Sequence, residues 1–521
     1  MEKKLKKWQG WALFIGSMVV VFCLGLLVSS LMERRAEVAS IYNNKKVEIK
    51  DSDYDKVSRN DVYADNYARE FNTWKATADT TYKGDYNSSQ AVDVLDARPN
   101  IPILWAGYAF AWDYTTPRGH MHAIEDITRS LRTGAPGVGI ETQPSTCWTC
   151  KSPDVPRLMA TMGGDKDGSI DAIRKGAAKF YSGKWGDEAW ASEVVNPIGC
   201  WDCHEAETMN LRISRPALVE AFERQGKDIS KATPQEMRTL VCAQCHVEYF
   251  FDNRDGKANY LTFPWDKGVT VEDIEAYYDE FEYADYVHAM SKAPILKAQH
   301  PGYETWQMGI HGQRGVSCAD CHMPYTVDGG VKFSDHQVQS PLAKMDRTCL
   351  VCHRQSEETL RKNVYDRYKA VDQERTILEG QLAAAHIEAA EAWKAGATEA
   401  EMKQALQMIR KAQWRWDFAV ASHGAAFHAP KEIARILANG IYYAGEARLA
   451  LTKVLAKHGV TDVKIPQFKN KKEAQAYIEP YVAGKITNFR TLEENNDRFL
   501  REVQPNWVKK AREKGRLTMD I

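Results

Sequence analysis

The chain has 521 residues, of which 69 are basic and 70 are acidic, and its formal net charge is −1. This length accommodates a sizeable buried core and more than one ordinary domain. The balanced charge excludes the broad positive field of a nucleic-acid-binding protein, so no nucleic acid is expected as a partner, and an anionic ligand needs a local basic pocket.

The first predicted element is an uncharged apolar run from Trp11 to Leu31, preceded by four lysines. A run of this length can span a bilayer, and the lysines place its amino-terminal side in the cytoplasm and the body outside. A secretory signal peptide cleaved after Val28-Ser29-Ser30 is the alternative. Residues 1–35 are therefore interpreted as a signal peptide or a membrane anchor, and the body as periplasmic.

The next stretch, residues 36–79, is polar and is predicted to be a linker. Residues 80–353 then carry ten of the eleven cysteines, all in C-x-x-C pairs, while Cys23 lies in the apolar run. The five pairs are Cys147/Cys150, Cys200/Cys203, Cys242/Cys245, Cys318/Cys321 and Cys349/Cys352. Exported proteins usually pair their cysteines as disulfides, but this spacing leaves none in the body for an ordinary disulfide.

Four of the five pairs are followed directly by a histidine: His204, His246, His322 and His353. C-x-x-C-H is the attachment signature of c-type haem. Two thioether bonds hold the porphyrin, and the adjacent histidine is an axial ligand of the iron. One such motif could bind zinc or occur by chance, but four in one exported chain predict covalent haems. Haems that fill the core also explain why residues 80–353 are loop-rich, with weak periodicity.

The remaining pair reads CWTCK, with Lys151 in place of the histidine. A degenerate site or a redox disulfide is the alternative, but four intact motifs favour a fifth haem whose iron is bound by the lysine amine. An amine binds iron only when it is deprotonated, and desolvation beside a cationic iron favours that neutral form. One haem that differs from four similar ones is the natural candidate for catalysis.

Six-coordinate haem irons also need ligands on their far sides, and ten histidines lie outside the motifs. They are His120, His122, His288, His300, His311, His336, His386, His423, His428 and His458. Counting alone does not choose among them, and a structural or surface role is the alternative for each.

The last region, residues 354–521, is predicted to be helical. Periodicity of apolar residues predicts helices over about 357–395 and 398–422, and Thr398 with Glu401 fits a capping box at the start of the second. These amphipathic helices can pack on the haem region or form a homodimer interface. The predicted fold class is mostly α: a multihaem cytochrome c fold with a haem-filled core, a loop-rich middle and long C-terminal helices.

Several phrases occur in a fixed order along the chain: CWTCK, CAQCHVEYF, LKAQHPGYETW, GIHG, CADCHMP and WRWDFAVASHG. In these phrases the chain resembles the pentahaem cytochrome c nitrite reductases that form ammonia, and the likeness runs from about Leu104 to the last residues. The resemblance implies that residues 80–353 are a pentahaem catalytic region and that the lysine-ligated haem is the active site. It also implies a homodimer and, with a retained anchor, a membrane multihaem quinol dehydrogenase as electron donor.

The resemblance implies roles for individual residues. Lys151 is the proximal ligand of the active haem, and its open face is lined by Arg118, Tyr249 and His300. The far-side ligands of the other four haems are His120, His311, His336 and His428. A calcium ion is held by the side chains of Glu248 and Gln299 and by the main-chain oxygens of Tyr249 and Lys297. The histidines left as non-ligands are His122, His288, His386, His423 and His458.

The chemistry of nitrite reduction agrees with these roles. Nitrite loses both oxygens as water, which takes six electrons and eight protons. Arg118 and a protonated His300 offer positive charge and hydrogen bonds to those oxygens, and Tyr249 can deliver protons. Calcium prefers oxygen ligands, which Glu248 and Gln299 provide.

The sequence therefore predicts a periplasmic dissimilatory nitrite reductase that forms ammonium, with four bis-histidine haems that relay electrons to the fifth. Hydroxylamine, nitric oxide and sulfite are further expected substrates. Two alternatives stay open: a non-catalytic electron-transfer cytochrome, and a related oxidoreductase for hydroxylamine or a sulfur oxyanion. CWTCK favours an enzyme, because a pure electron carrier gains nothing from one odd, open haem.

Overall fold

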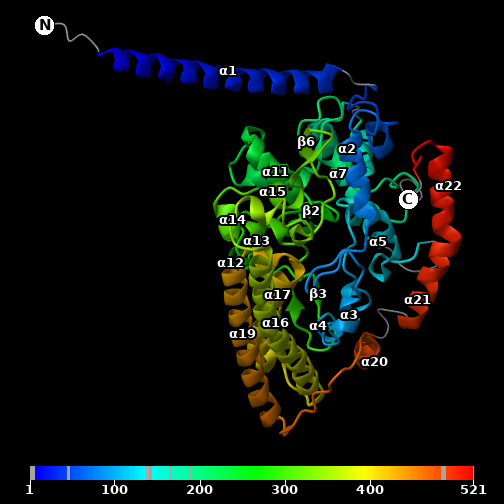
Figure 1. Ribbon diagram of the computed structural model, residues 1–521. Helices are drawn as coiled ribbons and strands as arrows, with labels where there is room; N and C mark the ends of the chain where they lie inside the picture. Colours follow the sequence, from blue (N-terminus) through cyan, green and yellow to red (C-terminus); the bar gives the residue numbers. More distant parts are fainter. Residues whose placement is uncertain are drawn as a thin grey trace.

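A computed structural model describes residues 6–43, 47–136, 138, 143–164, 167–187, 191–482 and 489–519. Helices dominate these residues, and the described strands form three separate antiparallel pairs. In Figure 1 one long helix projects from the body, a middle region of short elements follows, and three long helices lie together along one side. The predicted mostly α fold is confirmed.

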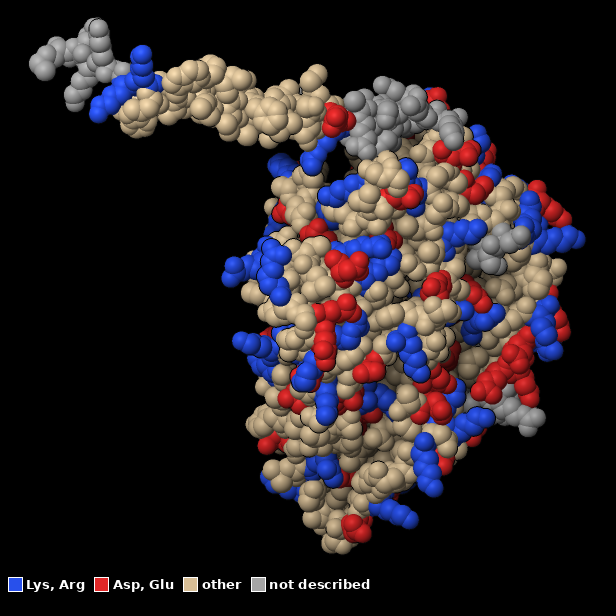
Figure 2. All heavy atoms as spheres, viewed as in Figure 1, with Lys and Arg blue, Asp and Glu red and all other residues tan. Residues whose placement is uncertain are grey.

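The projecting helix, α1, spans Lys7–Asn43 and so continues beyond the apolar run. Its segment Lys7–Arg34 is long and apolar enough to cross a membrane, and no part of it is buried in the protein. Figure 2 shows charges only near the two ends of this helix, whereas both signs are interspersed over the visible face of the body. A helix of this kind fits a membrane anchor or a signal sequence.

The expected polar linker is wrong for the part that the structure describes, because residues 47–79 pack on the body. Ile49, Val57 and Tyr63 are buried in one cluster with Trp201 of the CWDCH motif. These apolar side chains are spaced irregularly among polar ones, so they give no helical or strand period. The segment that follows α1 therefore reaches a haem-attachment motif within a few residues.

The middle region is built from short helices and strands. Its helices are α2 (Ala68–Lys75), α3 (Val94–Ala97), α4 (Ile101–Leu104), α5 (Ala123–Arg129), α6 (Asp154–Met162), α7 (Ile170–Tyr181), α9 (Cys200–Cys203), α10 (Pro216–Arg224), α11 (Pro234–Ala243), α12 (Val271–Asp279), α13 (Gly302–Met308), α14 (Ile310–Gln313) and α15 (Cys318–His322). Its strands pair as β1 (Phe250–Asp252) with β2 (Tyr260–Thr262), β3 (Tyr286–Val287) with β4 (Pro294–Ile295), and β5 (Tyr325–Asp328) with β6 (Val331–Ser334). CWDCH lies on α9, CAQCH at the end of α11 and CADCH on α15.

The carboxy-terminal region contains the long helices. They are α16 (Glu357–Lys394), α17 (Glu399–Ala421) and α19 (Pro430–Lys457), with the shorter α18 (Ala425–His428), α20 (Lys471–Val482), α21 (Phe489–Arg498) and α22 (Gln504–Glu513). The predicted capping box is confirmed, since the Thr398 hydroxyl accepts from the Glu401 N–H and the Glu401 carboxylate accepts from the Thr398 N–H. Both predicted helices therefore begin and end within one or two residues of their expected bounds.

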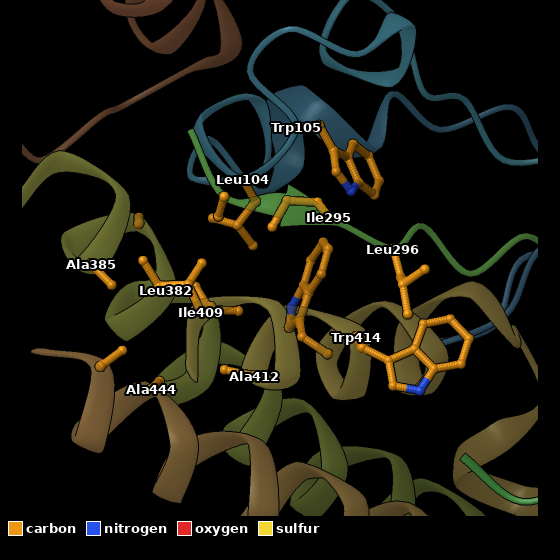
Figure 3. Close-up of a cluster of buried hydrophobic side chains, with 14 of the residues drawn as sticks. Leu104, Trp105, Ile295, Leu296, Leu382, Ala385, Ile409, Ala412, Trp414 and Ala444 are labelled. Atoms are coloured by element: carbon orange, nitrogen blue, oxygen red, sulfur yellow. The ribbon is translucent and has the colours of Figure 1, made fainter. Parts of the chain in front are cut away.

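The two regions share one hydrophobic core. Figure 3 shows Leu104 and Ile295 of the middle region lying against Leu382 of α16 and Ile409 of α17. Trp414 of α17 is fully buried in the same cluster. Burial of these apolar surfaces is the main stabilising contribution to the contact between the regions. The long helices thus form a support on which the attachment motifs are positioned.

Candidate haem and active site

Three motif histidines each face a second histidine across a gap as wide as a metal ion. The distances between ring centres are 6.2 Å for His204 and His336, 6.2 Å for His353 and His311, and 6.4 Å for His322 and His428. Bonds of about 2 Å from two imidazoles to opposite sides of one metal place the ring centres about 6 Å apart. Each pair therefore has the spacing of two axial ligands of one iron.

Main-chain carbonyls hold three of these rings in the tautomer that binds metal. The Nδ1 atoms lie 2.7 Å from the oxygen of Met209 for His204, 2.9 Å from that of Gln339 for His322, and 2.7 Å from that of Ser334 for His336. A carbonyl oxygen only accepts, so Nδ1 carries the proton and the Nε2 lone pair is available to a metal. Burial lowers the pKa of His204 to about 4, which keeps its ring neutral.

The last attachment pair contains the most exposed cysteine of the five pairs. Cys352 is exposed, whereas the nine other cysteines of the C-x-x-C pairs are partly buried. Its neighbours Val351 and His353 are exposed as well, because CLVCH ends where the chain leaves the middle region and enters α16. A thiol reacts when it is accessible, so exposure does not prevent a thioether bond. Cys352 therefore stays a predicted attachment residue.

The fourth motif histidine, His246, lies in a different arrangement. Its ring centre is 4.7 Å from that of His300, too close for an iron between the two rings. Burial, and then the neighbouring His300 and His120, lower the pKa of His246 well below its usual value. His120 is thus near His246, and it is the predicted ligand left when the three pairs above are taken out.

Three histidines that the sequence analysis excluded as ligands use both ring nitrogens elsewhere. His122 contacts Glu125 through Nδ1 at 3.2 Å and the Ala78 oxygen through Nε2 at 3.1 Å. The rings of His288 and His386 stack with their centres 3.7 Å apart, and each ring has hydrogen bonds at both nitrogens. His423 differs, because its ring centre lies 6.1 Å from that of His300, but neither residue follows an attachment pair.

Two of the groups predicted to surround the active haem, Tyr249 and His300, lie beside CWTCK. Burial raises the pKa of Tyr249 well above its usual value, and the Cys150 and Cys147 thiols raise it further, which places the phenol beside this pair. Burial, followed by His423 and Lys151, lowers the pKa of His300 to about 3. The imidazole is therefore neutral in the polypeptide, because its neighbours here are cationic or neutral.

Arg118, the fourth predicted pocket residue, is held by two carboxylates. Its guanidinium donates to Asp126 at 2.8 Å and to Glu125 at 2.6 Å, and its side chain is 16% exposed. Burial by itself lowers the pKa of Arg118, but the hydrogen bonds and charges of Asp126 and Glu125 raise it overall. The sequence analysis missed both acidic partners, which follow Arg118 on the start of α5.

The predicted calcium ligands lie together. The Glu248 carboxylate is fully buried and accepts from the Gln299 main-chain N–H at 2.6 Å, while the Gln299 side-chain amide donates to the Lys297 carbonyl at 3.0 Å. Tyr249 is the next residue in the chain. Carboxylate, amide and carbonyl oxygens in one buried place are the donor set of a hard cation such as calcium.

Two further acids lie near Glu248. Burial raises the pKa of Glu304 to about 7 and that of Asp285 to about 7, and both carboxyls raise the pKa of Glu248. One Glu304 oxygen, Oε2, is buried without a hydrogen-bond partner. The nearby Lys297 ammonium is paired with Asp417 at 3.0 Å instead. Glu304 belongs to the LKAQHPGYETW phrase, so its presence in this phrase could have pointed to it.

These features together define a class of protein. All eleven cysteines are described, and none of them forms a disulfide. Three histidine pairs have the spacing of axial ligands, and each includes the histidine of a C-x-x-C-H motif, which is the arrangement of a multihaem c-type cytochrome.

The chain belongs to the cytochrome c552 family, whose sequence pattern matches residues 59–515. It is 62% identical to a cytochrome c-552 of Bacteroides fragilis over 519 residues, which are 99% of each chain. It is 58% identical to the cytochrome c-552 of Porphyromonas gingivalis, over 99% of this chain and 98% of that protein.

A solved structure resembles the fold. It is the catalytic subunit of the cytochrome c nitrite reductase from Desulfovibrio desulfuricans, described with two calcium sites. The TM-score is 0.74 with 28% sequence identity, over 86% of this chain and 96% of that one.

Proposed function

We propose that this protein is an exported nitrite reductase that converts nitrite to ammonium. The observation that carries the proposal is the CWTCK attachment pair, with Tyr249 and His300 beside it, in a chain whose four other pairs are C-x-x-C-H. The likeness to the catalytic subunit of a cytochrome c nitrite reductase supports the same substrate. An electron carrier has no use for the odd site, so the enzyme is the better conclusion.

Five covalent haems are assigned to the five pairs. Three have the axial histidine pairs described above, and the fourth, at CAQCH, takes His246 with His120 by elimination. The fifth, at CWTCK, takes the Lys151 amine. Bound there, haem supplies an open iron position for nitrite and electrons from the other four haems.

The chain's own residues bind the anion and manage its protons. Arg118 offers a fixed positive charge and a planar set of donors to the nitrite oxygens. Nitrite also raises the pKa of His300, since an opposite charge within about 4–6 Å favours the charged imidazole. The neutral His300 ring can donate a hydrogen bond from its N–H to a nitrite oxygen as negative charge develops there. Tyr249 is the second hydrogen-bond donor on this face.

Calcium belongs to this site as a structural ion. The Glu248 and Gln299 side chains and the Tyr249 and Lys297 carbonyls would hold it, and it would then fix the segments that carry Tyr249 and His300. We expect chelation of calcium to lower the melting temperature and kcat together, while Glu248→Ala mimics chelation and no longer responds to it. Calorimetry with and without a chelator measures this, and an unchanged melting temperature in the wild type would contradict the assignment.

The CWDCH motif contacts the segment that follows α1, so a haem held there would receive electrons from the membrane side. The segment that follows α1 packs on this motif, and Asp51 accepts hydrogen bonds from the Trp201 indole at 2.7 Å and from Arg212 at 3.1 Å. Retention of α1 as an anchor would hold this haem close to a membrane multihaem quinol dehydrogenase. The exposed apolar residues Tyr442 and Leu449 of α19 suit a homodimer contact.

Spectroscopy and turnover test the function directly. The wild type should show one open, nitrite-sensitive iron among five by electron paramagnetic resonance, and should reduce nitrite with a reduced-dye donor. His300→Ala and Arg118→Ala should each lower kcat by about 10²–10³-fold while all five haems stay attached. Five low-spin irons whose resonance signals do not change with nitrite would refute the proposal. Parallel turnover assays with hydroxylamine and sulfite rank the related activities.

A further inference from the structure

A buried hydrogen-bonding centre made by Ser214 and Arg215 lies among three of the five attachment motifs. Both residues are fully buried and precede α10. The Arg215 guanidinium donates to the carbonyl oxygens of Thr149 at 2.7 Å and Ser152 at 3.1 Å. These two carbonyls flank Lys151 on either side, so one planar group fixes the main chain that carries the lysine.

The same centre reaches the CWDCH motif through its third residue, Asp202. Arg215 donates to the Asp202 carboxylate at 2.5 Å, and the Ser214 hydroxyl donates to the Asp202 carbonyl at 2.6 Å. Asp202 is itself only 3% exposed, so the ion pair is shielded from water. Charge-assisted hydrogen bonds in a buried place are strong and directional.

Gln244, the third residue of CAQCH, is also bonded to this centre. Its side-chain oxygen accepts from the main-chain N–H groups of Ser214 at 2.9 Å and Arg215 at 3.1 Å, and its amide donates to the Asp202 carbonyl at 3.0 Å. Ser214, Arg215 and Gln244 thus connect the Lys151, CWDCH and CAQCH loops to one another.

The two other attachment motifs do not reach the Lys151 loop through their third residues. Asp320 of CADCH caps its own helix and contacts Gln235 and Arg238 of α11, the helix that ends in CAQCH. Val351 of CLVCH is 61% exposed. The centre is therefore specific to the loop that carries Lys151 and to its CWDCH and CAQCH neighbours.

We infer that Arg215 is a positioning residue that holds the Lys151 loop in register with the CWDCH and CAQCH loops. This inference rests on the proposed function, in which the Lys151 loop carries the active haem. A displaced loop changes how the amine meets the iron and how far the active haem lies from its electron donors. A misplacement of about 1 Å at a catalytic group can cost about 10²-fold in rate.

The centre depends on the planar, forked arrangement of the guanidinium donors and not only on its positive charge. Arg215 donates to the Thr149 and Ser152 carbonyls, the Asp202 carboxylate and, at 2.6 Å, the Ser214 hydroxyl. The compact ammonium of a lysine cannot reproduce that planar set. If charge alone mattered, Arg215→Lys would behave as the wild type and Arg215→Gln would not. If the fork matters, both variants lose the positioning.

The matched control is Arg415, which is also buried in an ion pair. Its guanidinium bonds Glu275 at 3.0 Å and 3.2 Å and the Lys411 carbonyl at 3.0 Å, all within the helical bundle and its contact with α12. Arg415→Lys carries a similar cost of disturbing a buried ion pair. It leaves the attachment loops unchanged.

The experiment compares Arg215→Lys, Arg215→Gln and Arg415→Lys in the full holoprotein, after the wild type has been tested for its open iron and nitrite turnover. We expect both Arg215 variants to alter the resonance signal and reduction potential of the lysine-ligated haem and to lower kcat about tenfold, with KM within about twofold. Arg415→Lys should lower the melting temperature to a similar extent and leave the signal, the potential and kcat unchanged.

Wild-type signal, potential and kcat in Arg215→Lys would overturn the inference, as would identical changes in Arg415→Lys. Where the Arg215 variants do not accumulate with five haems, Ser214→Ala decides, because it removes one donor to Asp202 and keeps the arginine. A wild-type signal and kcat in Ser214→Ala then overturns the inference. Failure of the proposed function is separate, since it would be seen as absent nitrite turnover in the wild type.

Discussion

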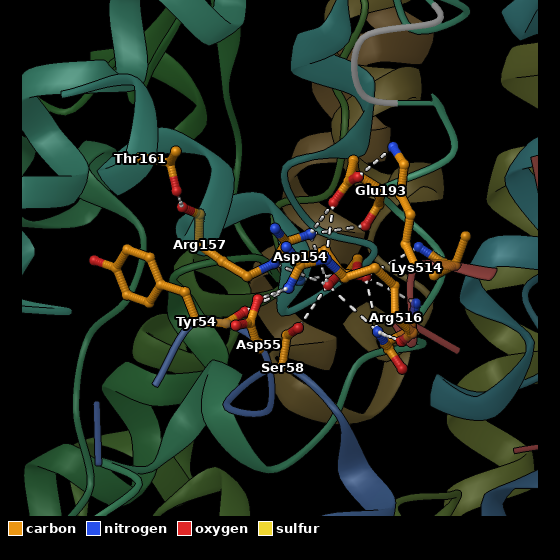
Figure 4. A network of polar contacts seen from close by, with 12 residues as sticks. Tyr54, Asp55, Ser58, Asp154, Arg157, Thr161, Glu193, Lys514 and Arg516 are labelled. Atoms are coloured by element: carbon orange, nitrogen blue, oxygen red, sulfur yellow. Dashed lines mark hydrogen bonds and ion pairs between the residues drawn. The ribbon is translucent and has the colours of Figure 1, made fainter. Parts of the chain in front are cut away.

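The middle region and the helical bundle are stabilised in different ways. The helices α16, α17 and α19 bury their own apolar side chains against one another, as with Leu378, Leu382 and Leu437. The middle region consists of short elements tied by buried polar groups, and Figure 4 shows one example around Asp154. Its carboxylate accepts from Ser58, Arg157 and Asn196. The bundle thus follows from apolar periodicity, whereas the middle region depends on local polar contacts and on its haems.

Removal of one haem should have the largest effect, and it tests whether the middle region depends on its haems while the bundle does not. The double variant Cys242→Ala, Cys245→Ala removes the CAQCH thioether bonds. The haem expected there is then lost, and the middle region has a cavity in its place. We expect loss of nitrite turnover and of the folded middle region, while helical content in the bundle persists. Intact mass, circular dichroism and hydrogen exchange measure the three effects.

Cys23→Ala is the matched control for that change, because Cys23 lies exposed in α1 outside any attachment pair. It should keep five haems and the wild-type rate. A double variant at CAQCH with four haems and a normally protected middle region would show that the middle region does not depend on that cofactor.

The sequence predicted most of what depends on pattern. The bundle helices and the Thr398 capping box were predicted because apolar spacing and cap chemistry are local properties. The haem sites were predicted because covalent attachment requires a fixed local spacing. The packing of residues 47–79 and the Arg215 centre were not predicted, since they depend on how segments far apart in the chain come together and leave no period or motif.

A cavity in the bundle tests whether its stability is separate from the site. Leu382→Ala removes a fully buried side chain of α16, and we expect it to cost about 2–5 kcal/mol of stability. Haem content and kcat should stay as in the wild type, because Leu382 touches the middle region only through the shared core. Ile377→Ala, 53% exposed on the same helix, should change stability by less than about 0.5 kcal/mol.

Acid should loosen the contact between the two regions through a buried histidine pair. His288 of the middle region stacks on His386 of α16, and burial lowers the pKa of His386 from 6.5 to about 4. Between these two pH values the unfolded chain binds a proton that the folded chain does not bind. The free energy of unfolding therefore decreases as pH falls from about 6.5 to about 4. The loss due to His386 is about 2 kcal/mol by pH 5.

Denaturant titrations at pH 7 and pH 5 measure that loss, and His386→Gln should reduce the difference between the two pH values by the same amount. A difference equal in the variant and the wild type would mean that other groups cause the acid sensitivity. His288 is expected to contribute in the same direction, because burial and the His386 ring lower its pKa well below the usual value.

The smallest expected effect is confined to the first turn of α17. It tests whether the stability of a bundle helix comes from its own local contacts. Thr398→Ala removes the hydroxyl that accepts from the Glu401 N–H, which should cost about 1 kcal/mol and speed amide exchange in the first turn of α17 about fivefold. Thr452 is the control: it lies exposed inside α19 and its hydroxyl donates to the Arg448 carbonyl of its own helix. Thr452→Ala should leave exchange unchanged or slow it, since alanine favours a helix interior. If both variants left the first turn of α17 equally protected, its stability would come from packing on the haem-bearing region and not from the local cap.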